Sequence, residues 1–194
     1  MRIACLGLGR MGWPIAGHLA NRGEEHDIVV FDVVDGLGSR WAGEHRGAAA
    51  DSVASAVDGA QFVITSLPAD RELAAVAEEA LAAVGRRTVW IDHSTTSARI
   101  ARELGAEVSA AGGHFLDGPV SGGVDGAQRG TLTVMVGGDK EAFAAAEPLI
   151  DVYASRVRHM GPVGSGQLTK MTNQICVVGL CQALAEGLDF ASRA

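Results

Sequence analysis

The glycine-rich stretch Gly7-Leu8-Gly9-Arg10-Met11-Gly12 constrains the fold of this chain more than any other feature. It directly follows an apolar run, residues 3–6, and directly precedes a helical pattern, residues 13–22. In a strand–turn–helix unit of this kind, the first glycine allows a tight turn, the second lets the backbone approach a pyrophosphate, and the third lets the helix pack closely on the strand. The N-terminus of the helix adds free N–H groups and a partial positive charge. Residues 7–12 are therefore predicted to bind the phosphates of a dinucleotide.

An acidic residue supports this interpretation, which would be weak on the glycines alone. A second apolar run, residues 28–31, ends in Asp32, twenty residues after Gly12. At this offset a carboxylate is expected to bind the 2′-hydroxyl of the adenine ribose, and it would repel a 2′-phosphate. No arginine follows directly, because the next residues are Val33 and Val34. The pattern favours NAD over NADP.

Further apolar runs without polar alternation are separated by helical patterns along most of the chain. This arrangement is typical of a parallel sheet with helices on both faces, so we predict an α/β, doubly wound fold. The clearest strand candidates after Asp32 are residues 61–67, 88–91, 114–117, 131–136 and 157–160, and the clearest helix candidates are residues 37–44, 70–84, 95–109 and 139–150.

Charge and composition exclude several classes of protein. The formal net charge of −7 disfavours a nucleic-acid partner and an anionic membrane surface. The six histidines show no metal-binding spacing, so we predict no metal site. Three cysteines (Cys5, Cys176 and Cys181) do not suit a disulfide framework, and we expect buried thiols in a cytoplasmic protein. The N-terminus begins with a strand pattern and shows no signal peptide.

The last segment differs from the rest, because one helical pattern runs from about residue 164 to the end. Its stretch Ile175 to Cys181 is apolar on every side, and such a helix must be buried on every side. One side can lie on the preceding domain, but the sequence stops at Ala194 with nothing left to cover the other. We expect either a truncated chain or a helix covered by another subunit. The run is too short to span a bilayer, so no membrane partner is expected.

Loops at the carboxyl ends of the predicted strands are where an open parallel sheet binds ligands. Leu67 and Pro68 are predicted to form a wall of the cofactor site, with a strand-ending turn as the alternative. Ser94 and Thr95 offer hydroxyl and N–H groups to a ligand, and they can equally cap the next helix. His93 is the only histidine in this group of loops and is a minor catalytic candidate.

Two further stretches can act on a substrate. The hydroxyl of Ser121 and the accessible backbone of Gly122 and Gly123 could bind a carboxylate, although the loop can also be purely structural. Lys170 lies in the first turns of the last helix, and Asn173 falls on the same helical face. Partial desolvation disfavours a charged lysine and suits it to proton transfer. The alternative is a lysine whose stem packs while its amine reaches water.

Four motifs in this order resemble the β-hydroxyacid dehydrogenase family, which includes 3-hydroxyisobutyrate dehydrogenase and tartronate semialdehyde reductase and is 6-phosphogluconate dehydrogenase-like. The resemblance covers the whole chain. The motifs are the glycine stretch with Pro14, Ala16 and Leu19; Asp92-His93-Ser94-Thr95; Asp117-Gly118-Pro119-Val120-Ser121-Gly122-Gly123; and residues 161–173, ending in Lys170-Met171-Thr172-Asn173.

The resemblance implies a Rossmann-type NAD-binding domain over residues 1–163. Residues 164–194 would begin a long interdomain helix, whose all-helical C-terminal domain is absent from this sequence. Lys170 would be the catalytic general acid/base, Ser121, Gly122 and Gly123 would bind a small carboxylate substrate, and Asn173 would orient it. The implied reaction is reversible oxidation of a small 3-hydroxy acid to its semialdehyde. A homo-oligomer, a dimer in the family, would form through the C-terminal helix.

Two rival functions stay open from the sequence. Imine reductases share the architecture by family resemblance, but they usually lack the catalytic lysine, so Lys170 weighs against this class. A module that binds NAD(P)H without turnover is the other, and the abrupt end at Ala194 is the only feature that favours it.

Overall fold

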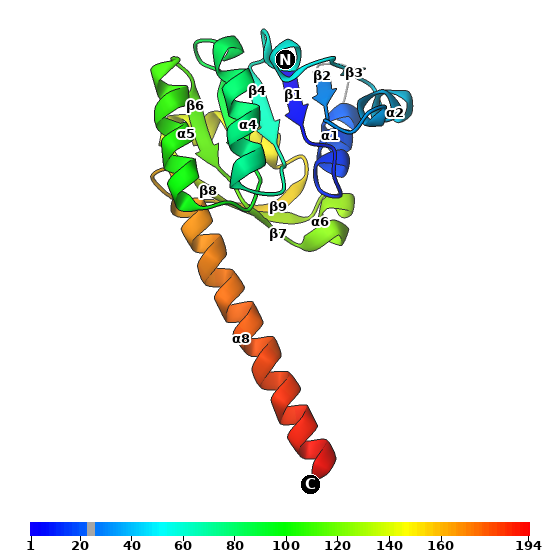
Figure 1. The fold of residues 1–194 in the computed structure, drawn as a ribbon, viewed down its shortest axis with the longest axis vertical. Coiled ribbons are helices and arrows are strands. Elements are labelled where there is room, and N and C mark those ends of the chain that lie inside the picture. Colours follow the sequence, from blue (N-terminus) through cyan, green and yellow to red (C-terminus); the bar gives the residue numbers. More distant parts are fainter. Residues whose placement is uncertain (23–25) are drawn as a thin grey trace.

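The computed structural model describes residues 1–22 and 26–194. A twisted sheet carries helices on both faces, and one long helix extends away from it (Figure 1). The strands are β1 (Arg2–Leu6), β2 (Asp27–Phe31), β3 (Ala48–Ala49), β4 (Phe62–Thr65), β5 (Val89–Asp92), β6 (His114–Asp117), β7 (Val120–Ser121), β8 (Leu132–Gly137) and β9 (Ala154–Gly161). The helices are α1 (Gly12–Asn21), α2 (Leu37–Glu44), α3 (Val53–Val57), α4 (Asp70–Ala80), the 3₁₀ turn η1 (Leu81–Ala83), α5 (Ala98–Ala110), α6 (Gly123–Arg129), α7 (Lys140–Ile150) and α8 (Ser165–Arg193).

The strand order confirms the predicted doubly wound architecture. Six parallel strands lie in the order β3-β2-β1-β4-β5-β6, and the order reverses between β1 and β4. In such sheets the ligand site lies outside the carboxyl ends of the strands at this reversal. Beyond β6 the sheet continues through β8, which is antiparallel to β6 and β7 and parallel to β9.

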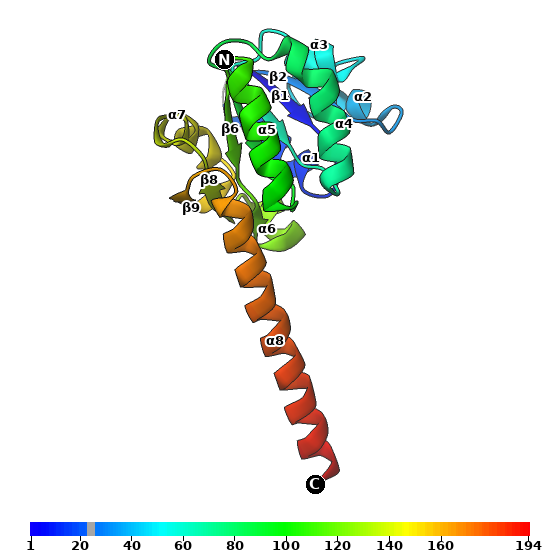
Figure 2. The same cartoon turned by 60° about the vertical axis from the view of Figure 1, so that its left-hand side comes forward.

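Two apolar cores, one on each face of the sheet, explain why the strands are apolar throughout. Successive side chains of a strand point to opposite faces. Ile3 and Cys5 of β1 accordingly belong to the core that contains residues of α1 and α7, whereas Ala4 and Leu6 belong to the core under α3, α4 and α5. Figure 2 shows α4 and α5 on one side of the strands and α7 on the other. A strand buried on both faces has no polar side to show.

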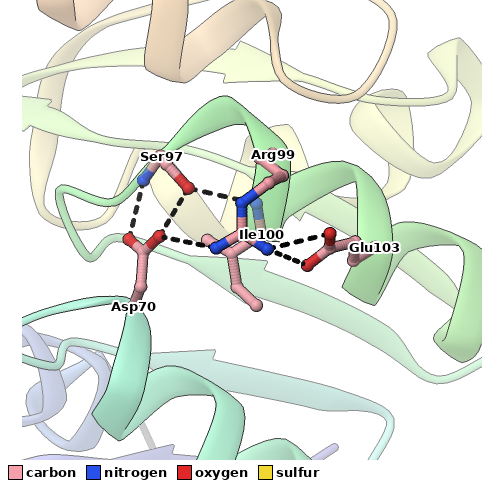
Figure 3. A network of polar contacts seen from close by, with 5 residues as sticks. All are labelled: Asp70, Ser97, Arg99, Ile100 and Glu103. Atoms are coloured by element: carbon pink, nitrogen blue, oxygen red, sulfur yellow. Dashed lines mark hydrogen bonds and ion pairs between the residues drawn. The ribbon is translucent and has the colours of Figure 1, made fainter.

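Helix α5 begins three residues later than the sequence pattern predicts, because its N-terminus is bonded to the neighbouring helix. Ser97 is the N-cap, and its hydroxyl accepts a hydrogen bond from the Ile100 N–H. The backbone N–H and the hydroxyl of Ser97 in turn donate to the Asp70 carboxylate at the start of α4 (Figure 3). These bonds lower the pKa of Asp70 and join the segments that follow β4 and β5.

Helix α8 projects from the domain and does not lie along it (Figures 1 and 2). The expectation that one side of this helix packs on the preceding domain is correct only for its first turns. Beyond Lys170 its apolar side chains are exposed, for example Ile175 at 74% and Leu180 at 71%. Cys5 is buried as expected, but Cys176 and Cys181 are exposed, because nothing within the described residues covers this helix.

The length of α8 changes one expectation about membranes. The sequence argument considered only the uninterrupted apolar run of residues 175–181. The complete helix is long and apolar enough to cross a bilayer by length and composition, and none of its most apolar window is buried. This is weak evidence by itself, because a helix that packs against other protein segments passes the same test.

Candidate cofactor and substrate site

The glycine turn between β1 and α1 has the geometry that a dinucleotide requires. Gly7 adopts φ +91°, which L side chains rarely adopt. A Cβ atom on Gly12 would overlap the Gly7 carbonyl oxygen and lie 3.0 Å from its carbonyl carbon. A Cβ atom on Gly9 would meet nothing within 4 Å, so this backbone faces open space. Gly7 and Gly12 are thus required by the local backbone, whereas the backbone at Gly9 is open.

Asp32 lies beside this turn, at the end of the adjacent strand β2. Its Oδ2 accepts a hydrogen bond from the Leu8 N–H at 2.6 Å, and its Oδ1 accepts one from the Val34 N–H at 2.8 Å. The carboxylate is therefore held between the glycine turn and the segment after β2. Val33 and Val34 are 84% and 58% exposed beside it. This placement is compatible with binding to the ribose that is adjacent to the pyrophosphate.

The loops after β4 and β5 are connected through one buried carboxyl group, Asp92. Its Oδ1 accepts hydrogen bonds from the Thr65 hydroxyl at 2.7 Å and the Ser94 hydroxyl at 2.6 Å. The Ser94 hydroxyl also accepts the Leu67 N–H at 2.9 Å. Burial raises the pKa of Asp92 to about 6, against the opposing effect of these hydrogen bonds. Both partners of the Ser94 hydroxyl lie within the protein, whereas Thr95 is exposed. The hydroxyl of Ser94 therefore positions the Leu67-Pro68 segment directly.

His93, the minor catalytic candidate, is buried away from this surface. Its Nδ1 is hydrogen-bonded to the Gly118 carbonyl oxygen, and its Nε2 lies 2.8 Å from the Tyr153 hydroxyl. Burial lowers the pKa of His93 to about 4. Both ring nitrogens are occupied and the ring is neutral at pH 7, so His93 connects the strands and has no nitrogen left for a ligand.

Ser121, Gly122 and Gly123 lie at the same edge of the sheet, in β7 and the start of α6. Gly122 adopts φ +128° and Gly123 φ +62°, and a Cβ atom on Gly123 would meet nothing within 4 Å. The backbone here is accessible, as a carboxylate site requires. α6 has only seven residues. We therefore treat residues 121–123 as a turn and do not count them as a helix N-terminus.

Lys170 lies one and a half turns into α8 and is only 9% exposed. Desolvation lowers the pKa of its amine. Within residues 1–22 and 26–194, no hydrogen bond or ion pair involves this amine, so it is available to another group. Asn173 is half-buried one turn further on. The low exposure of Lys170 and the lowered pKa of its amine thus agree with the predicted partial desolvation.

Asp117 and Gln167 lie within the four sequence motifs, but the sequence analysis assigned no role to either residue. The Asp117 carboxylate, at the end of β6, accepts the Gly164 N–H at 2.7 Å and the Gln167 N–H at 2.9 Å. It therefore caps α8 although it lies far away in sequence. The position of Asp117 at the end of a predicted strand was the available signal for such a role. Its hydrogen-bond partners on α8 could not be inferred from the sequence. Among the described residues, no cluster of His, Cys, Asp or Glu could hold a metal ion.

The fold and the glycine turn together define an NAD-binding domain of the Rossmann type. The chain belongs to the β-hydroxyacid dehydrogenase family: residues 2–161 match the family model described as the NAD binding domain of 6-phosphogluconate dehydrogenase.

Similar proteins support this assignment along the whole chain. An uncharacterized oxidoreductase of Shewanella frigidimarina is 42% identical, over 100% of this chain and 67% of its own length. A 3-hydroxyisobutyrate dehydrogenase of Pseudomonas aeruginosa is 38% identical, over 96% of this chain and 64% of its own length. The structure of the Mycobacterium tuberculosis 3-hydroxyisobutyrate dehydrogenase with L-serine has a TM-score of 0.94 and 37% identity, over 99% of this chain and 65% of that one. The chain thus spans about two thirds of these relatives.

Proposed function

We propose that this chain provides the cofactor domain and the proton-transfer residue of an NAD-dependent oxidoreductase that interconverts a small 3-hydroxy acid and its semialdehyde. The observation that carries the proposal is the unpaired amine of Lys170, a residue that is only 9% exposed, on a helix that starts at the carboxyl edge of the sheet. The glycine turn lies at this same edge. Partial desolvation lowers the pKa of this amine, which makes it easier to deprotonate than an ordinary lysine and suits it to accept and return a proton.

In this proposal each cofactor residue has a defined contact. The Gly7 N–H donates to Phe31 and the Leu8 N–H to Asp32, so the N–H groups of residues 9–12, at the N-terminus of α1, bind the pyrophosphate. Asp32 binds the adenine ribose and disfavours NADP. The Leu67-Pro68 segment and Thr95 line the nicotinamide end, and Ser94 supports that segment through its bond to the Leu67 N–H.

The substrate residues act on the two ends of a small hydroxy acid. The Ser121 hydroxyl and the backbone of Gly122 and Gly123 bind its carboxylate, and Asn173 orients it beside Lys170. Bound NAD would supply the acceptor for the hydride that leaves the hydroxyl-bearing carbon. Lys170 takes the hydroxyl proton as the carbonyl forms, and it returns this proton in the reductive direction. Relatives named for 3-hydroxyisobutyrate and solved with L-serine make both compounds the first candidates.

The assembly of the protein follows from α8. We propose residues 1–163 as the cofactor domain and residues 164–194 as the start of an interdomain helix, whose apolar sides are covered by protein in a homo-oligomer. A cytoplasmic location without membrane insertion accompanies this proposal. Lys170 and Asn173 support the absence of membrane insertion, because a helix that carries substrate residues must remain at the edge of the sheet.

Replacement of Lys170 by alanine tests the assignment against a binding module without turnover and against an imine reductase. Lys170→Ala should reduce turnover of 3-hydroxy acids by about 10²–10⁴-fold, while calorimetric titration shows NADH affinity within about twofold of the wild type. Lys140→Ala is a matched control, because Lys140 is exposed and is the only other lysine of the chain. NADH binding without turnover by the wild type on the whole substrate panel would favour the binding module. Turnover that persists in Lys170→Ala would exclude Lys170 as the proton-transfer group.

A further inference from the structure

The position of Lys170 depends on a short segment at the start of α8. Residues 171–194 are exposed apart from the half-buried Asn173, so the remainder of this helix does not hold it on the sheet. Gly166, Gln167 and Lys170 are the buried residues of α8. What fixes this first turn therefore decides where the Lys170 amine lies relative to the loops of the candidate site.

Gln167 makes the closest polar connection between α8 and those loops. Its Nε2 donates to the Ser94 carbonyl oxygen at 2.8 Å, and its Oε1 accepts the Thr96 N–H at 3.1 Å. The side chain is fully buried. Both ends of one amide therefore bind the segment after β5, and this segment also carries Ser94, whose hydroxyl accepts the Leu67 N–H.

The backbone of the same residue is fixed independently, because the Gln167 N–H donates to the Asp117 carboxylate. Gln167 thus connects α8 to two places in the sheet. Its main chain binds the end of β6, and its side chain binds the loop after β5. Lys170 lies three residues further along the helix, on the same face. Asp117 is bonded to this turn, Arg102 of α5 lies beside Gly164, and Asp92 interacts electrostatically with Asp117. His93 is buried and neutral at pH 7.

We propose that Gln167 is a positioning residue, which ties the first turn of α8 to the segment 94–96 and thereby fixes Lys170 at the site without touching substrate. The inference rests on the proposed function for its catalytic meaning. An amide is suited to this role, because it supplies one donor and one acceptor at the same time. An apolar side chain of equal length would leave the Ser94 carbonyl oxygen and the Thr96 N–H without partners.

The test uses Gln167→Met, which keeps the length and approximate volume but removes both hydrogen bonds. The chain has two lysines, so NMR of ¹³C-labelled lysine separates Lys170 from the exposed Lys140 and follows each amine with pH. We expect the titration midpoint of Lys170 to move upward towards the ordinary lysine range, because a loosened turn admits water to the amine. Protection of the Thr96 amide from hydrogen exchange should fall by about tenfold.

Gln182→Met is the matched control, because Gln182 is an exposed glutamine of the same helix whose amide donates to Glu186. It should leave the Lys170 midpoint unchanged. If Gln167→Met does not fold, Gln167→Asn serves instead, because a shorter amide cannot span both partners.

A folded Gln167→Met or Gln167→Asn with an unchanged Lys170 midpoint and unchanged Thr96 protection would overturn the inference. This result would leave the proposed function intact. Conversely, failure of the wild type to bind NADH would overturn the proposed function, while the titration of Lys170 would still decide the role of Gln167.

Discussion

Gly9 and Gly12 lie three residues apart in the turn after β1, yet the structure predicts opposite consequences when each is replaced by alanine. A methyl group on Gly12 would overlap the Gly7 carbonyl oxygen. Backbone cannot move aside as a flexible side chain can, so we expect a cost of about 3 kcal/mol, the upper part of the usual range for overpacking. For a chain of this size this lowers Tm by about 6–12 °C.

A methyl group on Gly9 would meet nothing within 4 Å in the protein. Gly9→Ala should therefore keep the free energy of unfolding within about 0.5 kcal/mol of the wild type. The same methyl group would occupy the space through which the pyrophosphate approaches the backbone. The loss of one charge-assisted hydrogen bond, about 1.5–3 kcal/mol, corresponds to about a tenfold to hundredfold weaker Kd for NADH.

Thermal denaturation and calorimetric titration with NADH measure the two effects separately. Gly43→Ala is a suitable control, because Gly43 is exposed in the last turn of α2, away from the turn, and a Cβ atom there also meets nothing within 4 Å. It should leave the NADH affinity unchanged and should not lower Tm, because alanine has the higher helix propensity. Unchanged NADH affinity in Gly9→Ala would refute the assignment of the open backbone to the pyrophosphate, and an unchanged Tm in Gly12→Ala would refute the packing argument.

Three further outcomes follow from single features of the structure. Asp32→Asn keeps an acceptor for the Leu8 N–H but removes the negative charge, so the ratio of NAD to NADP affinity should fall by about tenfold; an unchanged ratio in calorimetry would remove the charge argument. Burial raises the pKa of Asp92 from 3.8 to about 6. The native state therefore binds more protons than the unfolded state between about pH 4 and 6, and the stability that this carboxyl contributes is lost as pH rises through this window, by about 3 kcal/mol in total. In chemical denaturation, the free energy of unfolding of Asp92→Asn should therefore rise relative to that of the wild type from pH 4 to 7. Parallel pH dependences of the two free energies would contradict the assignment. The exposed apolar face of α8 should make the chain self-associate; light scattering of a monomer at moderate concentration would argue against this, and Leu180→Glu should reduce the association.

Local sequence was sufficient for the glycine turn, its acidic partner and the alternation of strands and helices. These features depend on short-range physics. The positive φ of Gly7 and the close approach of Gly12 to the Gly7 carbonyl oxygen both arise within one turn, and continuous apolar runs require a sheet buried on both faces. Lys170 and Asn173 could be placed on one helical face, because helical spacing is local as well.

The environment of these residues was decided by the tertiary structure alone. The hydrogen bonds of Asp117 and Gln167 join positions 47 to 73 residues apart, and no local pattern specifies such pairs. The same holds for His93, whose burial removes it from the candidate site, and for Asp92, whose raised pKa depends on burial between neighbouring strands.

Helix α8 shows the division between the two sources of information most clearly. Its composition determined that it is a helix, apolar on every side, and that it must be covered. Its direction was decided by its N-terminal contacts, because Asp117 and Gln167 anchor the first turn, while the residues after Lys170 are exposed apart from the half-buried Asn173. Periodicity reports which faces of a helix are apolar, whereas the surface on which the helix rests is set by contacts that are distant in sequence.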